Sequence, residues 1–207
     1  MKKIMFDNHY GLEDAVLNGT KTMTRRFIPT EETEGGLVPV SFWNGKWCGA
    51  HGKPLKKQPY KVGERLAIAQ RYSELSWDES FYNMLKSKCE LLPQYELKGW
   101  DNKMFVKAEY MPHQIEITDV KVERIQDIVW KDCLREGVLK AYIGYYVPGI
   151  KCKDWENESH VDTEDFKTWK LFPTPEEAFA ALIKKIGGKK AWEDNPWVFA
   201  YSIKLIK

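Results

Sequence analysis

The chain has 207 residues, of which 43% are hydrophobic and 30% are charged, and this is sufficient for one domain with a real hydrophobic core. The 32 basic and 30 acidic residues leave a formal net charge of +2, which excludes a histone-like polycation but permits a local basic site. No apolar run approaches the ~20 residues of a membrane-spanning helix, and the apolar stretch at the N-terminus stops at Phe6, too early for a signal peptide.

The cysteines and histidines lack the spacing of metal ligands. The four cysteines lie far apart and form no C-x-x-C pair: Cys48, Cys89, Cys133 and Cys152. This pattern favours a reduced cytosolic protein with buried thiols. We therefore expect a cytoplasmic protein with no structural zinc and no cofactor.

The N-terminal elements come in the order strand, helix, strand. Residues 3–6 predict a short strand, and residues 9–18 predict a helix. Gly19 suits the left-handed position after a helix end. A basic, β-branched strand is expected over residues 20–27, and Pro29 ends it.

The middle of the chain contains an irregular stretch and then further strands. Residues 43–47 read Trp-Asn-Gly-Lys-Trp, which predicts a hairpin with an Asn-Gly turn. Beyond it, strands are expected at residues 65–72, 104–109 and 114–125 (one long bent strand or a strand pair), and helices at 77–88 and 130–136.

The strongest boundary signal belongs to a helix over residues 175–186. Thr174 is the expected N-cap, Pro175 occupies the first helical position, and Glu177 completes a capping box. Residues 197–206 form the last expected strand, which is apolar enough to be central in a sheet.

Strands dominate this order, and the helices do not alternate regularly with them. The sequence therefore predicts an α+β fold: a single domain, residues 1–207, built on a mixed β-barrel of about five or six strands with peripheral helices. Two inserts, at about residues 28–59 and 138–172, are expected to cover a cleft, because loops this long are usually functional.

The sharpest chemical pattern lies in residues 19–26. Three threonines and three cations occur within seven residues: Thr20, Lys21, Thr22, Thr24, Arg25 and Arg26. Arginine offers a planar fork of donors to phosphate or to a base edge, and threonine adds hydroxyl groups. The pattern indicates an anion or nucleotide site, with a solvated basic edge strand as the alternative.

This segment resembles the G-x-K-T-x-T-R-R signature of ASCH domains, including the version common in phage and prophage proteins. Four other blocks resemble family blocks in the same order, at residues 60–66, 117–128, 133–137 and 195–199. Together they frame nearly the whole chain outside the two inserts. The chain departs from the phage-type pattern at Ala69 and Gln70, where many members carry an Arg-Glu pair, and Gln70 can only hydrogen-bond.

The resemblance implies a PUA-like barrel and a role in RNA or nucleotide metabolism. We expect ligand-binding roles for residues of the basic segment and of neighbouring strands, with core packing as the alternative for the tryptophan: Thr22, Arg25, Arg26, Gln70, Tyr72 and Trp197. A characterised branch of the family hydrolyses the acetyl amide of N4-acetylcytidine with a Lys, a Thr and a Glu. The matching positions are Lys21, Thr24 and Glu116, and an activated Thr hydroxyl beside a desolvated Lys is plausible chemistry.

Three functions remain open at this stage. The first is a module that binds RNA, a nucleotide or a modified nucleoside through a basic cleft. The second is an amidohydrolase that deacylates a modified nucleoside such as N4-acetylcytidine. The third is a non-catalytic phage accessory protein. No membrane partner is expected, and the sequence does not indicate the oligomeric state.

Overall fold

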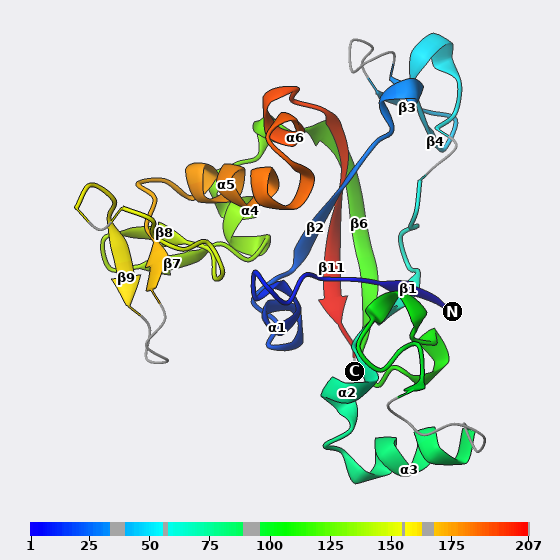
Figure 1. Ribbon diagram of the computed structural model, residues 1–207. Coiled ribbons are helices and arrows are strands. Elements are labelled where there is room, and N and C mark those ends of the chain that lie inside the picture. The colour runs from blue at the N-terminus through cyan, green and yellow to red at the C-terminus, as the bar shows by residue number, and fades with distance from the viewer. Residues whose placement is uncertain (34–39, 56–57, 89–95, 155, 163–167, 207) are drawn as a thin grey trace.

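The fold is a mixed α+β structure around one five-stranded sheet (Figure 1). The computed structural model describes residues 1–33, 40–55, 58–88, 96–154, 156–162 and 168–206. The strand order is β1-β5-β6-β11-β2. The strands of this sheet are β1 (Lys2–Ile4), β2 (Met23–Phe27), β5 (Arg65–Ile68), β6 (Gln114–Arg124) and β11 (Trp197–Leu205).

The two long strands β6 and β11 form the centre of the sheet and pair antiparallel along their whole length. On β6 the buried apolar residues alternate with more exposed ones, and Ile117 lies opposite Ile203. On β11 the four consecutive residues 198–201 are all buried, so both faces of this central strand are covered there. Strand β11 is also paired with β2, which confirms the expectation of a central C-terminal strand.

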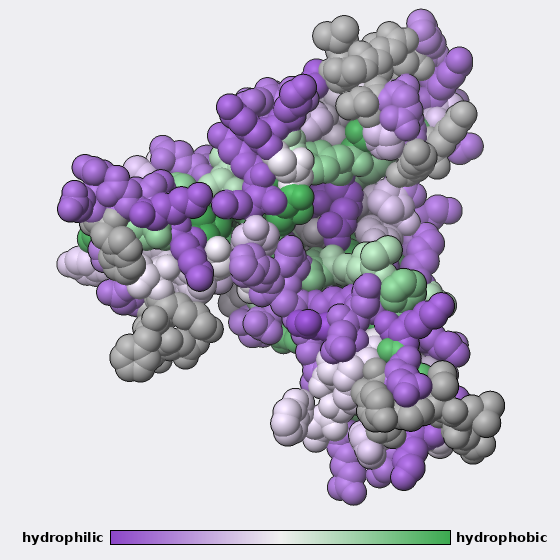
Figure 2. Space-filling model, viewed as in Figure 1, coloured by the Kyte–Doolittle hydropathy of each residue, from purple (hydrophilic) through white to green (hydrophobic). Residues whose placement is uncertain are grey.

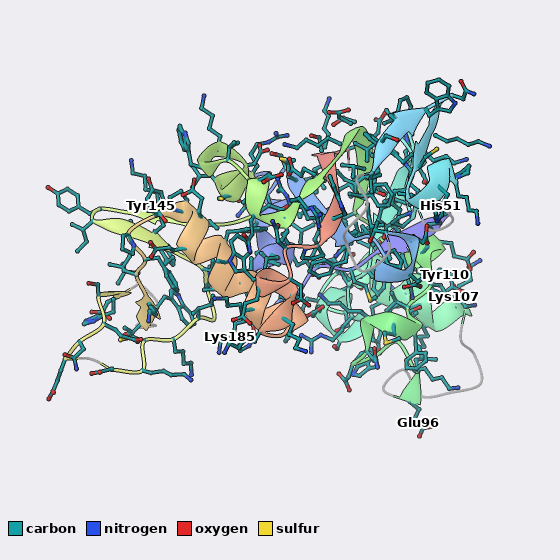
Figure 3. The ribbon with its side chains drawn as sticks, turned by 90° about the horizontal axis from the view of Figure 1, so that it is seen from above. His51, Glu96, Lys107, Tyr110, Tyr145 and Lys185 are labelled. Atoms are coloured by element: carbon teal, nitrogen blue, oxygen red, sulfur yellow. The ribbon has the colours of Figure 1, made fainter. Side chains whose placement is uncertain are left out.

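The helices and small hairpins surround this sheet (Figures 1 and 3). The helices are α1 (Leu12–Leu17), α2 (Tyr72–Leu75), α3 (Glu79–Lys88), α4 (Trp130–Arg135), α5 (Pro175–Gly187) and α6 (Lys190–Glu193). The short strands are β3 (Ser41–Trp43), β4 (Lys46–Cys48), β7 (Leu139–Ala141), β8 (Gly144–Tyr146), β9 (His160–Asp162) and β10 (Thr168–Lys170). The 3-10 turns are η1 (Thr30–Glu32), η2 (Ala50–Gly52), η4 (Lys103–Phe105), η5 (Ala108–Tyr110) and η6 (Ile125–Asp127).

Two groups of buried side chains hold the elements together. The larger group joins the inner face of the sheet to α5 through Phe179 and Leu182, which are 1% and 2% exposed. The smaller group lies under α2 and α3, around Tyr72 and Leu85. The α4–α5 side and the α2–α3 side therefore flank the sheet, and Figure 3 shows Tyr145 on β8 at the opposite end from Lys107 and Tyr110.

The sheet is open in the described part of the chain, with β1 and β2 as its two edge strands. The predicted α+β class and the five mixed strands are present. In a closed barrel the two edge strands would pair with each other, and within the described residues β1 and β2 do not. One side chain bridges the two edges instead: Arg26 Nη2 donates to the carbonyl O of Met5 at 3.0 Å. We call this gap between β1 and β2 the seam.

The strand expected over residues 104–109 is wrong, because the segment forms the 3-10 turns η4 and η5. The Asn102 side chain accepts from Met104 N and starts the first turn. Lys3 Nζ donates to the carbonyl groups of Met104 and Val106 at 2.6 and 2.8 Å. These contacts satisfy backbone groups that would otherwise require a strand partner.

The two inserts contain more regular structure than the sequence predicted. Residues 138–172 include the pairs β7–β8 and β9–β10. Residues 28–59 include the expected hairpin β3–β4, whose Asn44 and Gly45 both have positive φ, as its Asn-Gly turn requires. Residues 34–39 and 56–57 of that insert lie outside the described residues. None of the described helices combines the length and apolar character needed to cross a bilayer.

Candidate functional site

A pocket of about 620 Å³ lies at the seam, within the usual size of small-molecule sites. Its walls come from residues 5–9 after β1, from Leu12, from β2, from residues 101–104 and from α5. Figure 2 shows a hollow near the centre of this face, with hydrophilic surface inside it and hydrophobic surface beside it. The inserts 28–59 and 138–172 contribute Ile28 and other residues to the core but none of the pocket lining, so the expected cover by the inserts is wrong for the residues described.

The pocket floor is formed by Lys21, Thr24, Arg25 and Glu136, each less than a tenth exposed. Lys21 Nζ lies 2.6 Å from Glu136 Oε2 and also donates to the Glu136 carbonyl at 2.6 Å. Arg25 Nη1 donates to the other carboxylate oxygen, Oε1, at 2.9 Å. One carboxylate is thus shared by two buried cations.

Two tight backbone turns, at Gly19 and Gly137, bring the floor residues together. Gly19 adopts φ 79° after α1, and Lys21 N then bonds to the Ala15 carbonyl at 2.7 Å. Thr22 N donates to the Arg135 carbonyl at 2.9 Å, which joins the segment to the end of α4. Regular strand structure begins only at Met23. Lys21 is therefore held on a bend, which lets it reach the same pocket as Thr24.

The carboxylate arrives from the last turn of α4. Gly137 follows Glu136 with φ 105°, a conformation that turns the chain sharply. A Cβ atom at Gly137 would lie 3.0 Å from Leu12, so the site has little room for a larger residue. The Glu-Gly sequence at this helix end hence positions the carboxylate.

Burial and charge act in opposite directions on Glu136 and Lys21. Burial alone would raise the pKa of Glu136, but Lys21 and Arg25 together outweigh it and hold that pKa below its ordinary value. Burial lowers the pKa of Lys21, and the neighbouring Glu136 opposes this shift. The pKa values of both groups are therefore lowered. Glu136 has two cationic partners that favour its charged form, whereas Lys21 shares one carboxylate with Arg25 and is repelled by Arg26 and Arg25.

Arg25 links the floor to a surface network of charges. Its Nε donates to Glu123 Oε1 at 3.1 Å, and its Nη2 lies 3.6 Å from Asp132. Lys121 bridges these two carboxylates at 3.0 and 2.8 Å. The donors of Arg25 are therefore largely occupied by carboxylates of the protein.

Two polar side chains of the pocket have no ion-pair partner in the described chain, Thr24 on the floor and Arg26 on the wall. Thr24 is 3% exposed, and within the described residues its hydroxyl makes no hydrogen bond. Arg26 lines the pocket, and no carboxylate of the described chain lies within ion-pair distance of it; its guanidinium donates instead to the Met5 carbonyl. The hydroxyl and this guanidinium are the natural contacts for a bound molecule.

The pocket rim is apolar and unusually exposed. Four large hydrophobic side chains surround the opening and are 44%, 44%, 66% and 49% exposed: Met5, Phe27, Met104 and Ile186. Deeper in the wall, Phe179 lies under the Arg25 guanidinium, whose carbon is 5.7 Å from the ring centroid. An apolar rim over a polar floor matches a flat molecule with a polar edge.

A second buried ion pair closes one side of the pocket. Lys103 donates to Glu13, to Asn8 Oδ1 and, at 3.2 Å, to the Phe6 carbonyl. Glu13 is 3% exposed, and its pKa is raised by burial despite the opposing charge of Lys103. The segment 101–104 is thereby tied to α1 and to the end of β1.

The structure brings four of the predicted site residues to the pocket and leaves the others elsewhere. Lys21, Thr24, Arg25 and Arg26 line it together. Glu116 does not line it: this residue lies on β6 with Arg65 and Lys204 as cross-strand neighbours, and the carboxylate at Lys21 is Glu136.

The remaining predicted ligand contacts have partners within the protein and do not line the pocket. The Thr22 hydroxyl accepts from Arg135 Nε at 3.1 Å. Gln70 is buried beside His113, with 2.6 Å between Oε1 and Nδ1. The Tyr72 hydroxyl accepts from Lys107 N at 2.9 Å. Trp197 stacks under Arg124, whose guanidinium carbon is 4.5 Å from the ring centroid.

Sequence reasoning missed Glu136, Lys103 and the α5 wall. Glu136 sits in the segment 133–137 that resembles a family block, and a glutamate just before a helix-ending glycine was the available signal. Lys103 had no such signal, because its partner Glu13 is 90 residues away.

Comparisons of the chain with protein-family models, with curated proteins and with solved structures find no match in any of the three. Within the described residues, no group of three or more His, Cys, Asp or Glu side chains is arranged to hold a metal ion. The site is thus a mixed polar and apolar pocket at the seam of an α+β sheet.

Proposed function

We propose that the pocket binds a nucleoside, free or within RNA, and that the chain is an ASCH-like member of the PUA-like group. The observation that carries the proposal is the joint placement of Lys21, Thr24, Arg25 and Arg26 on a pocket with an apolar rim. A base has two flat apolar faces and a polar edge, so its faces contact the rim while its edge meets the floor.

The charge balance of the pocket favours an uncharged base over a phosphate on the floor. Glu136 neutralises Lys21 and, together with Glu123, Arg25. Arg71 and Lys103 are paired with Glu74 and Glu13. Arg26 is the cation without a carboxylate in the described chain, so Arg26, rather than Arg25, is the candidate contact for a single phosphate.

Calorimetric titration of the protein with cytidine and N4-acetylcytidine tests this function. Thr24→Val keeps the shape and strand preference of the side chain but removes the hydroxyl, and we expect it to weaken nucleoside binding about fivefold to tenfold. Thr118→Val is the matched control, because Thr118 is an exposed strand residue on β6. Absence of nucleoside binding by the wild-type protein at millimolar concentration contradicts the proposal.

Hydrolysis of an acylated nucleoside is a second candidate, favoured by the buried Lys21 in the same pocket as Thr24. Burial lowers the pKa of Lys21, which favours proton transfer from the Thr24 hydroxyl to the Lys21 amine as the hydroxyl oxygen attacks the amide carbonyl. Lys21 then returns this proton to the leaving cytidine nitrogen as the C–N bond breaks, and water hydrolyses the acetyl ester left on Thr24. Glu136 then takes the place that the sequence assigned to Glu116, orienting Lys21. Release of cytidine and acetate from N4-acetylcytidine is the assay, and loss of this release in Thr24→Val but not in Thr118→Val supports the mechanism.

A further inference from the structure

A cluster of lysines adjoins the pocket at the end of α5. Lys184 and Lys185 lie in the last turn of this helix, and Lys189 and Lys190 follow at the start of α6. All four are exposed. In the described part of the chain, the carboxylate within ion-pair distance of the cluster is Glu193, 3.9 Å from Lys189, and an exposed pair at that distance neutralises little.

The apolar face of the same helix end forms part of the pocket. Ile183 and Ile186 line it, on either side of Lys184 and Lys185 in sequence. Gly187 packs against the pocket residue Phe27, whose ring lies 3.4 Å from where a Cβ atom at Gly187 would stand. Figure 3 shows Lys185 extending from α5 at the outer side of the molecule. Lys184 and Lys185 project from the sides of α5 that do not line the pocket, so the cluster shares the end of this helix with the rim, and a bound chain would have to leave the pocket around the helix end to reach it.

We propose that the pocket takes one base of a single-stranded nucleic acid, and that the phosphodiester backbone next to this base runs over Lys184, Lys185, Lys189 and Lys190. This inference rests on the proposed nucleoside-binding function. The inference adds the lysine surface to that function and names the substrate class as a single-stranded nucleic acid instead of a free nucleoside.

The distribution of charge carries the inference. Apart from Arg26, the lysines and arginines that line the pocket are paired with protein carboxylates, whereas the lysine cluster at the end of α5 is largely unpaired. A nucleotide chain has the complementary pattern, since its bases are uncharged and its backbone carries one negative charge per residue. An acidic protein segment would satisfy the lysines but would leave the pocket without a role.

The concave shape of the pocket favours a single strand over a duplex. A base can enter a pocket of this kind only when it is out of the helical stack, and extruding it from a duplex costs a few kcal/mol. The four lysines lie close together in the chain, at the end of α5 and the start of α6, so they need only a few neighbouring phosphates. A short oligonucleotide is therefore a sufficient probe.

Fluorescence anisotropy with labelled single-stranded hexanucleotides, one of RNA and one of DNA, tests the inference over a range of salt concentrations. The variant is Lys184→Gln/Lys185→Gln. The matched control is Lys86→Gln/Lys88→Gln, because these exposed lysines lie in the last turn of α3, which is well away from α5 (Figure 1). Free nucleoside binding is measured in parallel for all three proteins.

The wild-type protein should bind a hexanucleotide more tightly than the free nucleoside. In Lys184→Gln/Lys185→Gln, the slope of log affinity against log salt should become shallower by about 0.7 for each phosphate that the cluster no longer neutralises, while nucleoside affinity changes less than twofold. The control variant should keep the wild-type slope. The RNA and DNA arms then identify which backbone is preferred.

Two results overturn the inference while leaving nucleoside binding intact. One is equal affinity for the hexanucleotide and the nucleoside, and the other is an equal change of slope in the two lysine variants. Failure of the wild-type protein to bind any nucleoside is a different result, because it removes the proposed function on which the inference rests.

Discussion

The Oε2 atom of Glu136 lies 2.6 Å from the Nζ atom of Lys21, although the two residues are 115 positions apart in the chain. This contact joins the end of α4 to the segment that leads into β2. It also defines the pocket floor, because Arg25 uses the second oxygen of the same carboxylate. The stability of the fold and the chemistry of the site consequently depend on one buried group.

Glu136→Gln should destabilise the protein strongly. The substitution keeps the shape of the side chain but leaves the buried Lys21 without a carboxylate, while Arg25 keeps its pair with Glu123. Removal of one partner of a buried pair costs about 3–5 kcal/mol. Urea unfolding followed by tryptophan fluorescence measures the loss. The control Glu116→Gln, on the half-buried face of β6, should cost less than about 0.5 kcal/mol. Equal losses in the two variants would show that the buried carboxylate has no special role.

The contribution of Glu136 should depend on pH in a defined direction. Its pKa in the folded protein lies below the ordinary value of 4.5, so the unfolded chain binds the proton more readily. The stabilisation is therefore complete above about pH 4.5, and it is lost as the pH falls through the folded pKa. The difference in unfolding free energy between wild type and Glu136→Gln should be constant near pH 7 and should shrink in acid. If this difference in unfolding free energy instead grows in acid, the pKa of Glu136 in the folded protein is raised and not lowered.

Cys133 should resist alkylation in the folded protein. The thiol is fully buried, and burial, aided by the charge of Glu176, raises its pKa to about 12. The reactive thiolate is thus scarce at pH 8. Iodoacetamide labelling followed by mass spectrometry of peptides should show slow modification of Cys133 in buffer and rapid modification in denaturing urea. Similar rates under both conditions would mean that the end of α4 opens readily.

Lys103 and Glu13 should be strongly coupled energetically. Lys103→Met removes the cation beside a carboxylate that is 3% exposed, and Glu13→Gln removes the carboxylate. Each single substitution should cost about 3 kcal/mol, and the double variant should cost clearly less than their sum. Urea unfolding of the four proteins gives the coupling energy. If the two losses of unfolding free energy are simply additive, the ion pair is not what holds segment 101–104, and the bonds from Lys3 to its carbonyl groups hold it instead.

Local signals predicted the elements that depend on nearby residues. The helix expected over residues 175–186 is observed as α5, with Thr174 as its N-cap, whose side chain accepts from Glu177 N. This is one of the two bonds of the predicted capping box. The hairpin around Asn44 and Gly45 and the central strand β11 also follow from their own residues. In each case, the sequence contains the capping or turn residue that fixes the element.

Long-range contacts were beyond the same reasoning. The sequence pattern indicated an exposed strand carboxylate, Glu116, for the site, whereas the fold brings Glu136 there from the end of α4. Residues 104–109 have the composition of a strand, but the side chain of Lys3 satisfies the carbonyl groups of Met104 and Val106 instead of a neighbouring strand. Partners that are about 100 residues away leave no periodic trace in the sequence.

The open seam has a consequence for self-association. An edge strand normally offers its unpaired backbone groups to any other strand in solution, which is a common origin of aggregation. Here β2 ends the sheet beside a pocket bordered by Met5, Phe27 and Ile186, and Arg26 ties this edge to the backbone after β1. We therefore expect substitutions that remove this contact to increase self-association of the protein as well as to change what the pocket binds.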